Sequence, residues 1–205
     1  MEIQMPEFWQ LSPQRIALKA GQDQVKGRTT IGLYNVERDA KMTTLWRSIA
    51  GTTAILVYPN KPEHMEKLGR NSRTLQSGGT SEYYPGSIGI ALLSHKPDAI
   101  DIQVRQSNYR TSKAGEGRPE SRISKDFARK HLSGWDARVA KILIETAREF
   151  GKPVRIPYRA MHSGGLNTQT AFKGIIERAC EQHGARLVQS SGQFGRHYLL
   201  HPTPA

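Results

Sequence analysis

Residues 133–158, SGWDARVAKILIETAREFGKPVRIPY, carry the clearest structural pattern in the chain. Ser133, followed three residues later by Asp136, has the spacing of a capping box and predicts a helix start. The expected helix ends at Gly151, and residues 153–158 predict a short strand. One face of this helix is apolar and consists of Trp135, Val139, Ile142, Leu143 and Phe150.

The residues that follow predict a second helix and a hairpin. This helix starts at Asn167 or Thr168 and ends at Gly184. Its apolar residues have the i, i+3, i+4, i+7, i+8 spacing of a helix that packs one face on a core. They are Phe172, Ile175, Ile176, Ala179 and Cys180. Residues 186–189 and 196–201 predict two hairpin strands around an SSGQFG turn.

Upstream of residue 133 the patterns favour strands. TAILVY at 53–58 is almost continuously apolar, as expected of a strand covered on both faces. Residues 87–94 and 99–105 predict two more strands joined by an HKPD turn. A short helix is expected after Asn60, with Pro62 in its first turn.

The remaining N-terminal segments are less regular. The first thirty residues are expected to form an irregular arm, 29–34 a short strand, and 40–49 a helix ended by Gly51. Residues 70–87 are rich in Gly and Ser and predict a loop.

Together these patterns predict the α+β class, with a mixed β-sheet packed on helices and a basic C-terminal helix–strand–helix–β-hairpin unit. We divide the chain into an N-terminal arm and sheet region (1–104), a basic loop (105–132) and the C-terminal unit (133–205). The three segments can also form one continuous domain.

Composition limits the cellular compartments in which the protein is expected. No apolar run approaches the length of about 18 residues that a membrane span needs, and no signal-peptide pattern opens the sequence. The single cysteine, Cys180, excludes an internal disulfide and fits a reducing compartment. We therefore expect a soluble, cytoplasmic protein without a membrane partner.

Charge indicates the class of partner. The 205 residues contain 30 Lys and Arg against 18 Asp and Glu, a net charge of +12. Residues 105–131 have eight basic and three acidic side chains (+5), and residues 132–205 have ten and five (+5). Residues 61–104 have five of each and are neutral. Such an excess in one half of the chain favours a polyanionic partner, most simply DNA or RNA.

The basic segment is the first candidate site, because its cations can pair with phosphates and its aromatic residues can stack on bases. Its candidate residues are Arg105, Tyr109, Arg110, Lys113, Arg118, Arg122, Lys125, Phe127, Arg129 and Lys130. An ordinary solvated loop is the alternative interpretation.

The C-terminal unit is the second candidate, because its order of elements resembles a winged helix. The resemblance covers about 70 residues and implies that residues 168–183 are a recognition helix and 190–195 a wing tip. It implies base contacts from Asn167, Thr168, Gln169, Thr170 and Lys173, with Arg196 and His197 beside the wing.

A second resemblance starts earlier and covers most of the chain. Residues 99–118, AIDIQVRQSNYRTSKAGEGR, resemble the fourth strand and pyrophosphate loop of the GNAT acetyltransferase family. The resemblance implies that the turn at 115–118 holds the pyrophosphate of acetyl-CoA through backbone N–H groups. Ser112 stands where the family has Gln or Arg, and Pro119 follows the turn.

Other chemistry has little support in the sequence. His197 and His201 share a strand face without a third ligand, so no metal site is expected. No Walker loop, GxSxG or CxxC motif occurs. We therefore expect a non-catalytic nucleic-acid-binding protein without a cofactor. The alternatives are a GNAT-like acyl-CoA-dependent transferase, with acetyl-CoA as its cofactor, and a structural subunit of a nucleoprotein assembly with protein partners.

Overall fold

The structure is a computed structural model that describes residues 16–25, 28–49, 51–69, 74–77, 80–83, 86–109, 111, 123–158, 166–192 and 195–202. Within these ranges, side chains are described for 36–46, 51–69, 86–109, 111, 123–158, 172–192 and 195–202. The chain forms two units, residues 1–90 with 106–135 and residues 91–105 with 136–205.

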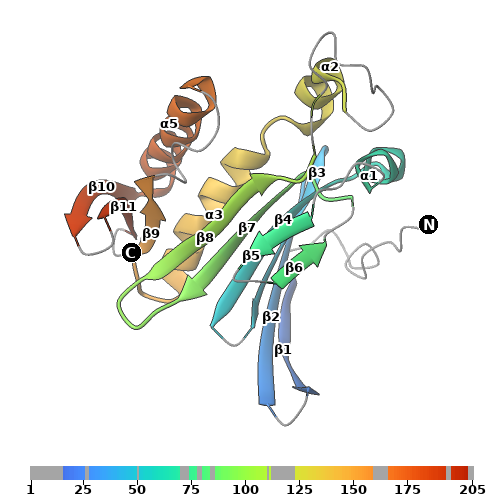
Figure 1. Cartoon of the computed structure of the whole chain (residues 1–205). Coiled ribbons are helices and arrows are strands. Elements are labelled where there is room, and N and C mark those ends of the chain that lie inside the picture. Colours follow the sequence, from blue (N-terminus) through green and yellow to red (C-terminus); the bar gives the residue numbers. More distant parts are fainter. Residues whose placement is uncertain are drawn as a thin grey trace. The chain divides into compact units, whose positions relative to one another are not determined.

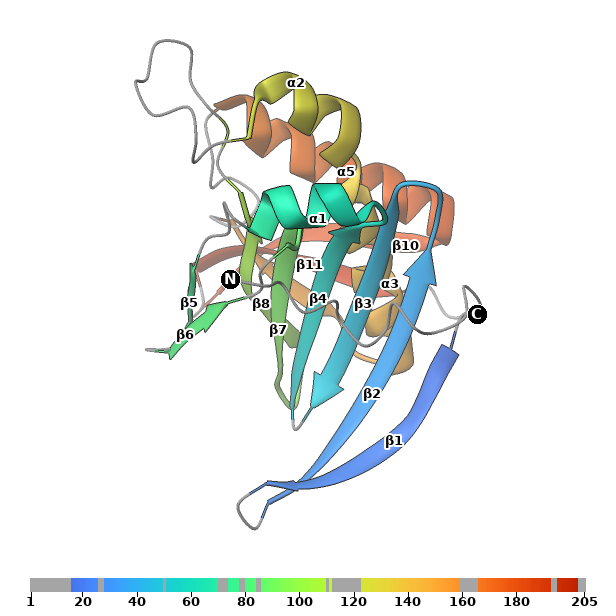
Figure 2. The ribbon, with the colours of Figure 1, turned by 90° about the vertical axis from the view of Figure 1, so that its right-hand side faces the viewer.

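The first unit contains a run of four antiparallel strands, shown in Figure 2. They are β1 (Ile16–Val25), β2 (Arg28–Arg38), β3 (Met42–Ile49) and β4 (Thr52–Pro59). The expected strand at 53–58 is confirmed, and the short strand expected at 29–34 is part of the longer β2. A second, two-stranded sheet consists of β5 (Thr74–Ser77) and β6 (Thr80–Tyr83).

Three predictions for this unit are wrong. Residues 16–25 form a strand and not an irregular arm, residues 40–49 contain β3 and not a helix, and the loop expected at 70–87 contains β5 and β6. In each case hydrogen bonds to a neighbouring strand decide the conformation. Those tertiary contacts override the local preferences from which the predictions were made.

The short helix expected after Asn60 is confirmed as α1 (Pro62–Gly69), and the Asn60 side chain makes two hydrogen bonds. Its side-chain Oδ1 accepts a hydrogen bond from the Thr43 hydroxyl at 2.6 Å, and its Nδ2 donates to the Asp39 carbonyl. Asn60 therefore ties the start of α1 to the turn between β2 and β3.

The second unit has the strand order β7-β8-β9-β11-β10 and two long helices (Figure 1). Its elements are β7 (Gly89–His95), β8 (Ile100–Ser107), α3 (Trp135–Glu149), β9 (Val154–Pro157), α5 (Leu166–His183), β10 (Ala185–Gly192) and β11 (Gly195–Pro202). Of the first two strands, residues 91–95 of β7 and 100–105 of β8 belong to this unit. β8 and β9 are parallel, whereas β11 is antiparallel to both β9 and β10, so the sheet is mixed.

The core of this unit follows the apolar faces that the sequence predicts. Val139, Ile142 and Leu143 of α3 are fully buried, as are Phe172 and Ile176 of α5. Strand residues complete the core: Ile100, Ile102, Val154, Ile156 and Leu200. The two helices, the strands at 87–94, 99–105 and 153–158, and the final hairpin are confirmed, and with them the α+β class with a mixed sheet on helices.

Candidate nucleic-acid interface

The described part of the predicted basic loop begins at the end of β8 and resumes before α2. Tyr109 is half-buried, and Thr111 forms a parallel bridge with Ile123. The candidates Arg110, Lys113, Arg118 and Arg122, and the glycine turn at 115–117, lie outside the described residues.

The last third of the loop is helical, with α2 (Lys125–Phe127) running into the π-helical turn η3 (Ala128–Leu132). Ser124 caps α2 by accepting a hydrogen bond from the Phe127 N–H at 3.2 Å. Ile123 and Leu132 are fully buried and anchor the two ends of this segment.

Three predicted phosphate-binding residues are exposed on this segment: Lys125, Arg129 and Lys130. Arg129 pairs with Asp126 at 3.1 Å, but both side chains are more than four-fifths exposed. An ion pair this exposed contributes little free energy, so Arg129 can exchange its carboxylate for a phosphate at low cost.

Helix α1 packs beside α2 and η3 within the first unit, as Figure 2 shows. The His64 ring lies 4.9 Å from the Phe127 ring and 4.5 Å from the His131 ring, centroid to centroid. The Lys67 ammonium lies 4.2 Å from the centre of the Phe127 ring. Sequence reasoning missed His64 and Lys67, although their i, i+3 spacing on α1 would have placed them on one helix face.

Both imidazoles in this group resist protonation. The pKa of His64 is lowered by partial burial first, then by His131 and by Lys61 and Lys67, while Glu63 opposes the shift. The pKa of His131 is lowered by partial burial and then by four lysines. The four are Lys130, Lys61, Lys41 and Lys67. Cations from three segments therefore converge on His131.

In the second unit, Arg105 is enclosed. Its side chain is 9% exposed, and its guanidinium donates to the Asp136 carboxylate at 2.6 Å and lies 3.7 Å from the centre of the Phe172 ring. Burial raises the pKa of Asp136, and the Arg105 charge opposes that shift. Arg105 thus joins β8 to the first turn of α3 and to α5.

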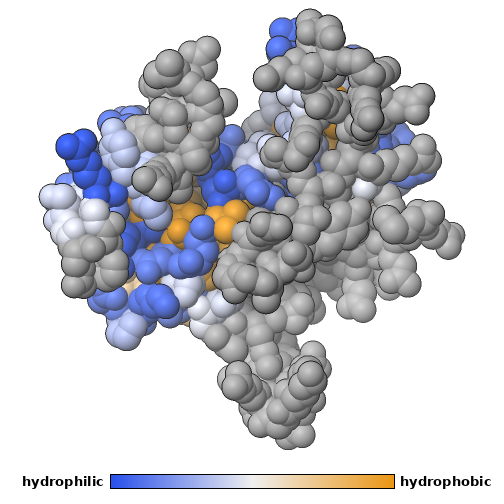
Figure 3. Space-filling view, in the orientation of Figure 1, coloured by the Kyte–Doolittle hydropathy of each residue, from blue (hydrophilic) through white to orange (hydrophobic). Residues whose placement is uncertain are grey.

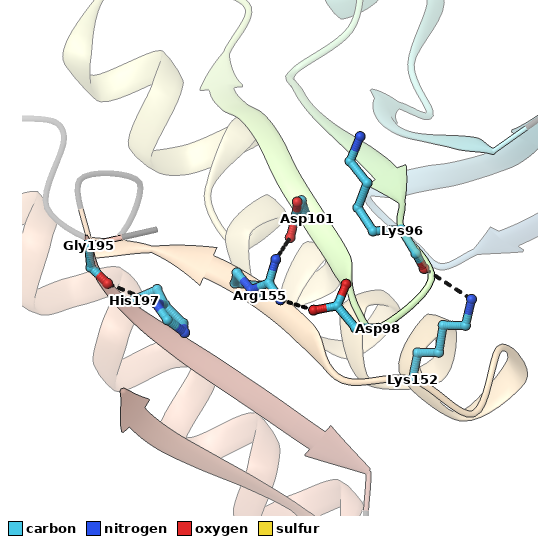
Figure 4. A network of polar contacts seen from close by, with 7 residues as sticks. All are labelled: Lys96, Asp98, Asp101, Lys152, Arg155, Gly195 and His197. Carbon is cyan, nitrogen blue, oxygen red and sulfur yellow. Dashed lines mark hydrogen bonds and ion pairs between the residues drawn. The ribbon is translucent and has the colours of Figure 1, made fainter. Parts of the chain in front are cut away.

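The parallel pairing of β8 with β9 is short. It covers only Ile100–Asp101 of β8 and Val154–Arg155 of β9, and the two strands diverge beyond it (Figure 1). Arg155 closes the paired stretch by donating to Asp101 at 2.9 Å and to Asp98 at 2.5 Å (Figure 4). Close by, His197 Nδ1 contacts the Gly195 carbonyl at 2.9 Å.

The winged-helix candidates lie on α5 and on the hairpin. Thr168 and Gln169 fall in the first turn of α5, where side chains are not described. Lys173 is partly exposed, pairs with Glu177 at 3.5 Å and lies 5.8 Å from the Tyr198 ring centre. Arg196 is exposed on the hairpin, whose surface is coloured mostly hydrophilic in Figure 3.

Three other features of the described residues bear on function. Cys180 is buried, and burial raises its thiol pKa to about 11, so it is not poised as a nucleophile. Within the described ranges no group of three or more metal-ligating side chains gathers. Of the helices in those ranges, none is both long and apolar enough to cross a membrane.

Comparison of the chain with protein-family models, with curated proteins and with solved structures finds no match.

Proposed function

We propose that the protein binds nucleic acid without catalysis, through phosphate contacts centred on α1, α2 and η3. The observation that carries the proposal is the set of exposed cations on these adjacent segments, gathered around half-buried aromatic rings. The set consists of Lys61, Lys67, Lys125, Arg129 and Lys130. The net charge of +12 and the single cysteine fit a cytoplasmic polyanion-binding protein.

The physical basis is counterion release. Each cation that neutralises a phosphate frees a condensed counterion, and the log of the affinity falls by about 0.9 per contact for each unit of log salt on duplex DNA. Five such cations make the slope of log affinity against log salt concentration large enough to measure easily. Such binding carries no sequence information by itself.

A salt titration tests the proposal. Binding to a generic duplex and to single-stranded RNA is measured from low to high salt, and we expect a linear fall in log affinity. Replacing Lys125, Arg129 and Lys130 by Gln should reduce the slope by roughly three units. The matched control replaces Lys96, Arg178 and Arg186 by Gln, three exposed cations of the second unit, and so removes the same charge elsewhere. No binding at low salt to either ligand would refute the proposal.

A specific observation favours a second candidate, an acyl-CoA-dependent transferase. The GNAT resemblance requires the strand before the glycine turn to separate from the next parallel strand, and β8 and β9 stay paired over only two residues each. Against it, Asp136 places a carboxylate in the first turn of α3, already paired with Arg105. A carboxylate there repels a pyrophosphate that would approach the same helix terminus.

Thermal melting with acetyl-CoA separates the two candidates. A ligand that binds only the native state raises the melting temperature by mass action. A rise at millimolar acetyl-CoA would favour the transferase, and an unchanged melting temperature leaves nucleic-acid binding as the supported function.

A further inference from the structure

Three aromatic rings meet where α1 packs against α2 and η3. His64, Phe127 and His131 lie with ring centroids 4.5–4.9 Å apart, and all three residues are half-buried. We call these three residues the ring cluster. The ring planes are tilted or perpendicular to one another, so these three rings are not stacked face to face, and the Lys67 ammonium lies 4.2 Å from the centre of the Phe127 ring.

Four lysines act electrostatically on the histidines of the ring cluster, and one of them, Lys67, also contacts the Phe127 ring. Lys41 comes from the turn before β3, Lys61 directly precedes α1, Lys67 belongs to α1 and Lys130 to η3, and all four are exposed. Among the charged groups that act on the two imidazoles, Glu63 is the one acid. The contact between Lys67 and the Phe127 ring stabilises the packing of α1 against α2, whereas the positive charges of the other three lysines oppose protonation of His131. An anion bound beside the rings would be stabilised by all of them.

We propose that the ring cluster is a binding site for unpaired nucleotides, with bases stacked on its rings and phosphates beside its lysines. This inference rests on the proposed function and adds its ligand class. Single strands are favoured over duplexes because a base can stack on a side chain only when it is not already stacked in a helix. DNA and RNA strands offer the same faces and phosphates.

Binding at this site takes up protons. In the free protein partial burial, and after it repulsion by the neighbouring positive groups, lowers the pKa of both imidazoles. A bound phosphate replaces that repulsion with attraction, so the imidazoles gain protons in the complex. Linkage then requires the affinity for single strands to increase as pH falls from about 8 to about 5.5.

The experiment uses the full chain and four variants. Dissociation constants for short mixed-sequence single strands of DNA and of RNA, and for the matching duplex, are measured at fixed ionic strength across this pH range. The test variants are Phe127→Leu and the double variant His64→Gln with His131→Gln. The matched controls are Phe150→Leu and His95→Gln, because His95 and Phe150 form a similar ring pair at 4.3 Å in the second unit, beside Lys152.

Phe127→Leu should weaken single-strand binding at least fivefold, because a stacked base contributes about 1–3 kcal/mol. The double histidine variant should bind with an affinity that varies much less with pH than that of the wild type. Both controls should match the wild type in affinity and in pH dependence. A melting curve for each variant shows whether it is folded. If Phe127→Leu does not fold, the double histidine variant tests the role of the ring cluster.

Two results overturn different claims. If the wild type binds no strand at low salt, the proposed function fails. If it binds but prefers duplex, or if the test variants behave like their controls, the ring cluster is structural packing and general phosphate binding remains.

Discussion

Arg155 shows how a buried charge is held at one position of the fold. Its side chain is 11% exposed and donates to Asp101, which is 21% exposed, and to Asp98, which is 65% exposed. The two carboxylates do not carry equal weight, since water screens the exposed one. The Arg155 pair with Asp98 lowers the pKa of that carboxyl, first through the side-chain hydrogen bond. Asp101, directly opposite Arg155 in the parallel register, is the partner that compensates the buried guanidinium.

Asp101→Asn should therefore cost roughly 2 kcal/mol in the free energy of unfolding, because it leaves a buried cation with one solvated partner. Asp98→Asn should cost less. Urea denaturation measures both, with Asp126→Asn as the control, since Asp126 pairs with Arg129 while both are almost fully exposed. Equal small losses for Asp101 and Asp98 would contradict this account and indicate that water reaches Arg155.

At the scale of elements, the local sequence pattern of β3 predicts a helix, whereas its pairing with neighbouring strands makes it a strand. Met42, Leu45, Trp46 and Ile49 have the i, i+3, i+4, i+7 spacing of an amphipathic helix, which explains the wrong prediction. In the structure this segment pairs with β2 on one side and β4 on the other. Helices α3 and α5 were predicted correctly because each runs for at least 15 residues with one apolar face.

Some residues of the candidate site could be predicted from the sequence, and others could not. Exposure of Lys125, Arg129 and Lys130 follows from their polar, aperiodic segment and could be predicted. Their neighbours His64 and Lys67 could not, because about 60 residues separate α1 from η3 and only tertiary packing joins them. Counting charge by segment also did not indicate the cations of α1, because residues 61–104 have no net charge as a whole.

Packing between elements of the first unit can be tested at Gly89, the first residue of β7. A Cβ built there would meet the Trp135 ring, with Cδ2 at 2.7 Å, well inside van der Waals contact. Gly89→Ala should destabilise the protein by about 1–3 kcal/mol, the usual cost of overpacking a core. Gly192→Ala is the control, because nothing lies within 4 Å of a Cβ at that position. Equal stabilities for the two variants in urea would show that Trp135 does not pack on Gly89.

At the scale of the whole molecule, electrostatics couple stability to pH. The chain has a net charge of +12 before any histidine is protonated, so each added proton increases self-repulsion. Both units contain histidines whose pKa is lowered. His64 and His131 belong to the first unit, and His95 belongs to the second, where burial and then Lys152 lower its pKa.

The melting temperature of the free protein should therefore fall as pH decreases from about 7.5 to 5.5. The sign follows from linkage, since these three histidines have pKa values below 6.5 when folded and near 6.5 when unfolded. Between those values the unfolded chain binds more protons, and acid favours unfolding. Replacing His64 and His131 by Gln should flatten the dependence, and adding His95→Gln should flatten it further. A melting temperature that rises toward pH 5.5, or a slope unchanged in the triple variant, would mean that burial and the neighbouring charges do not lower the pKa of these imidazoles in solution.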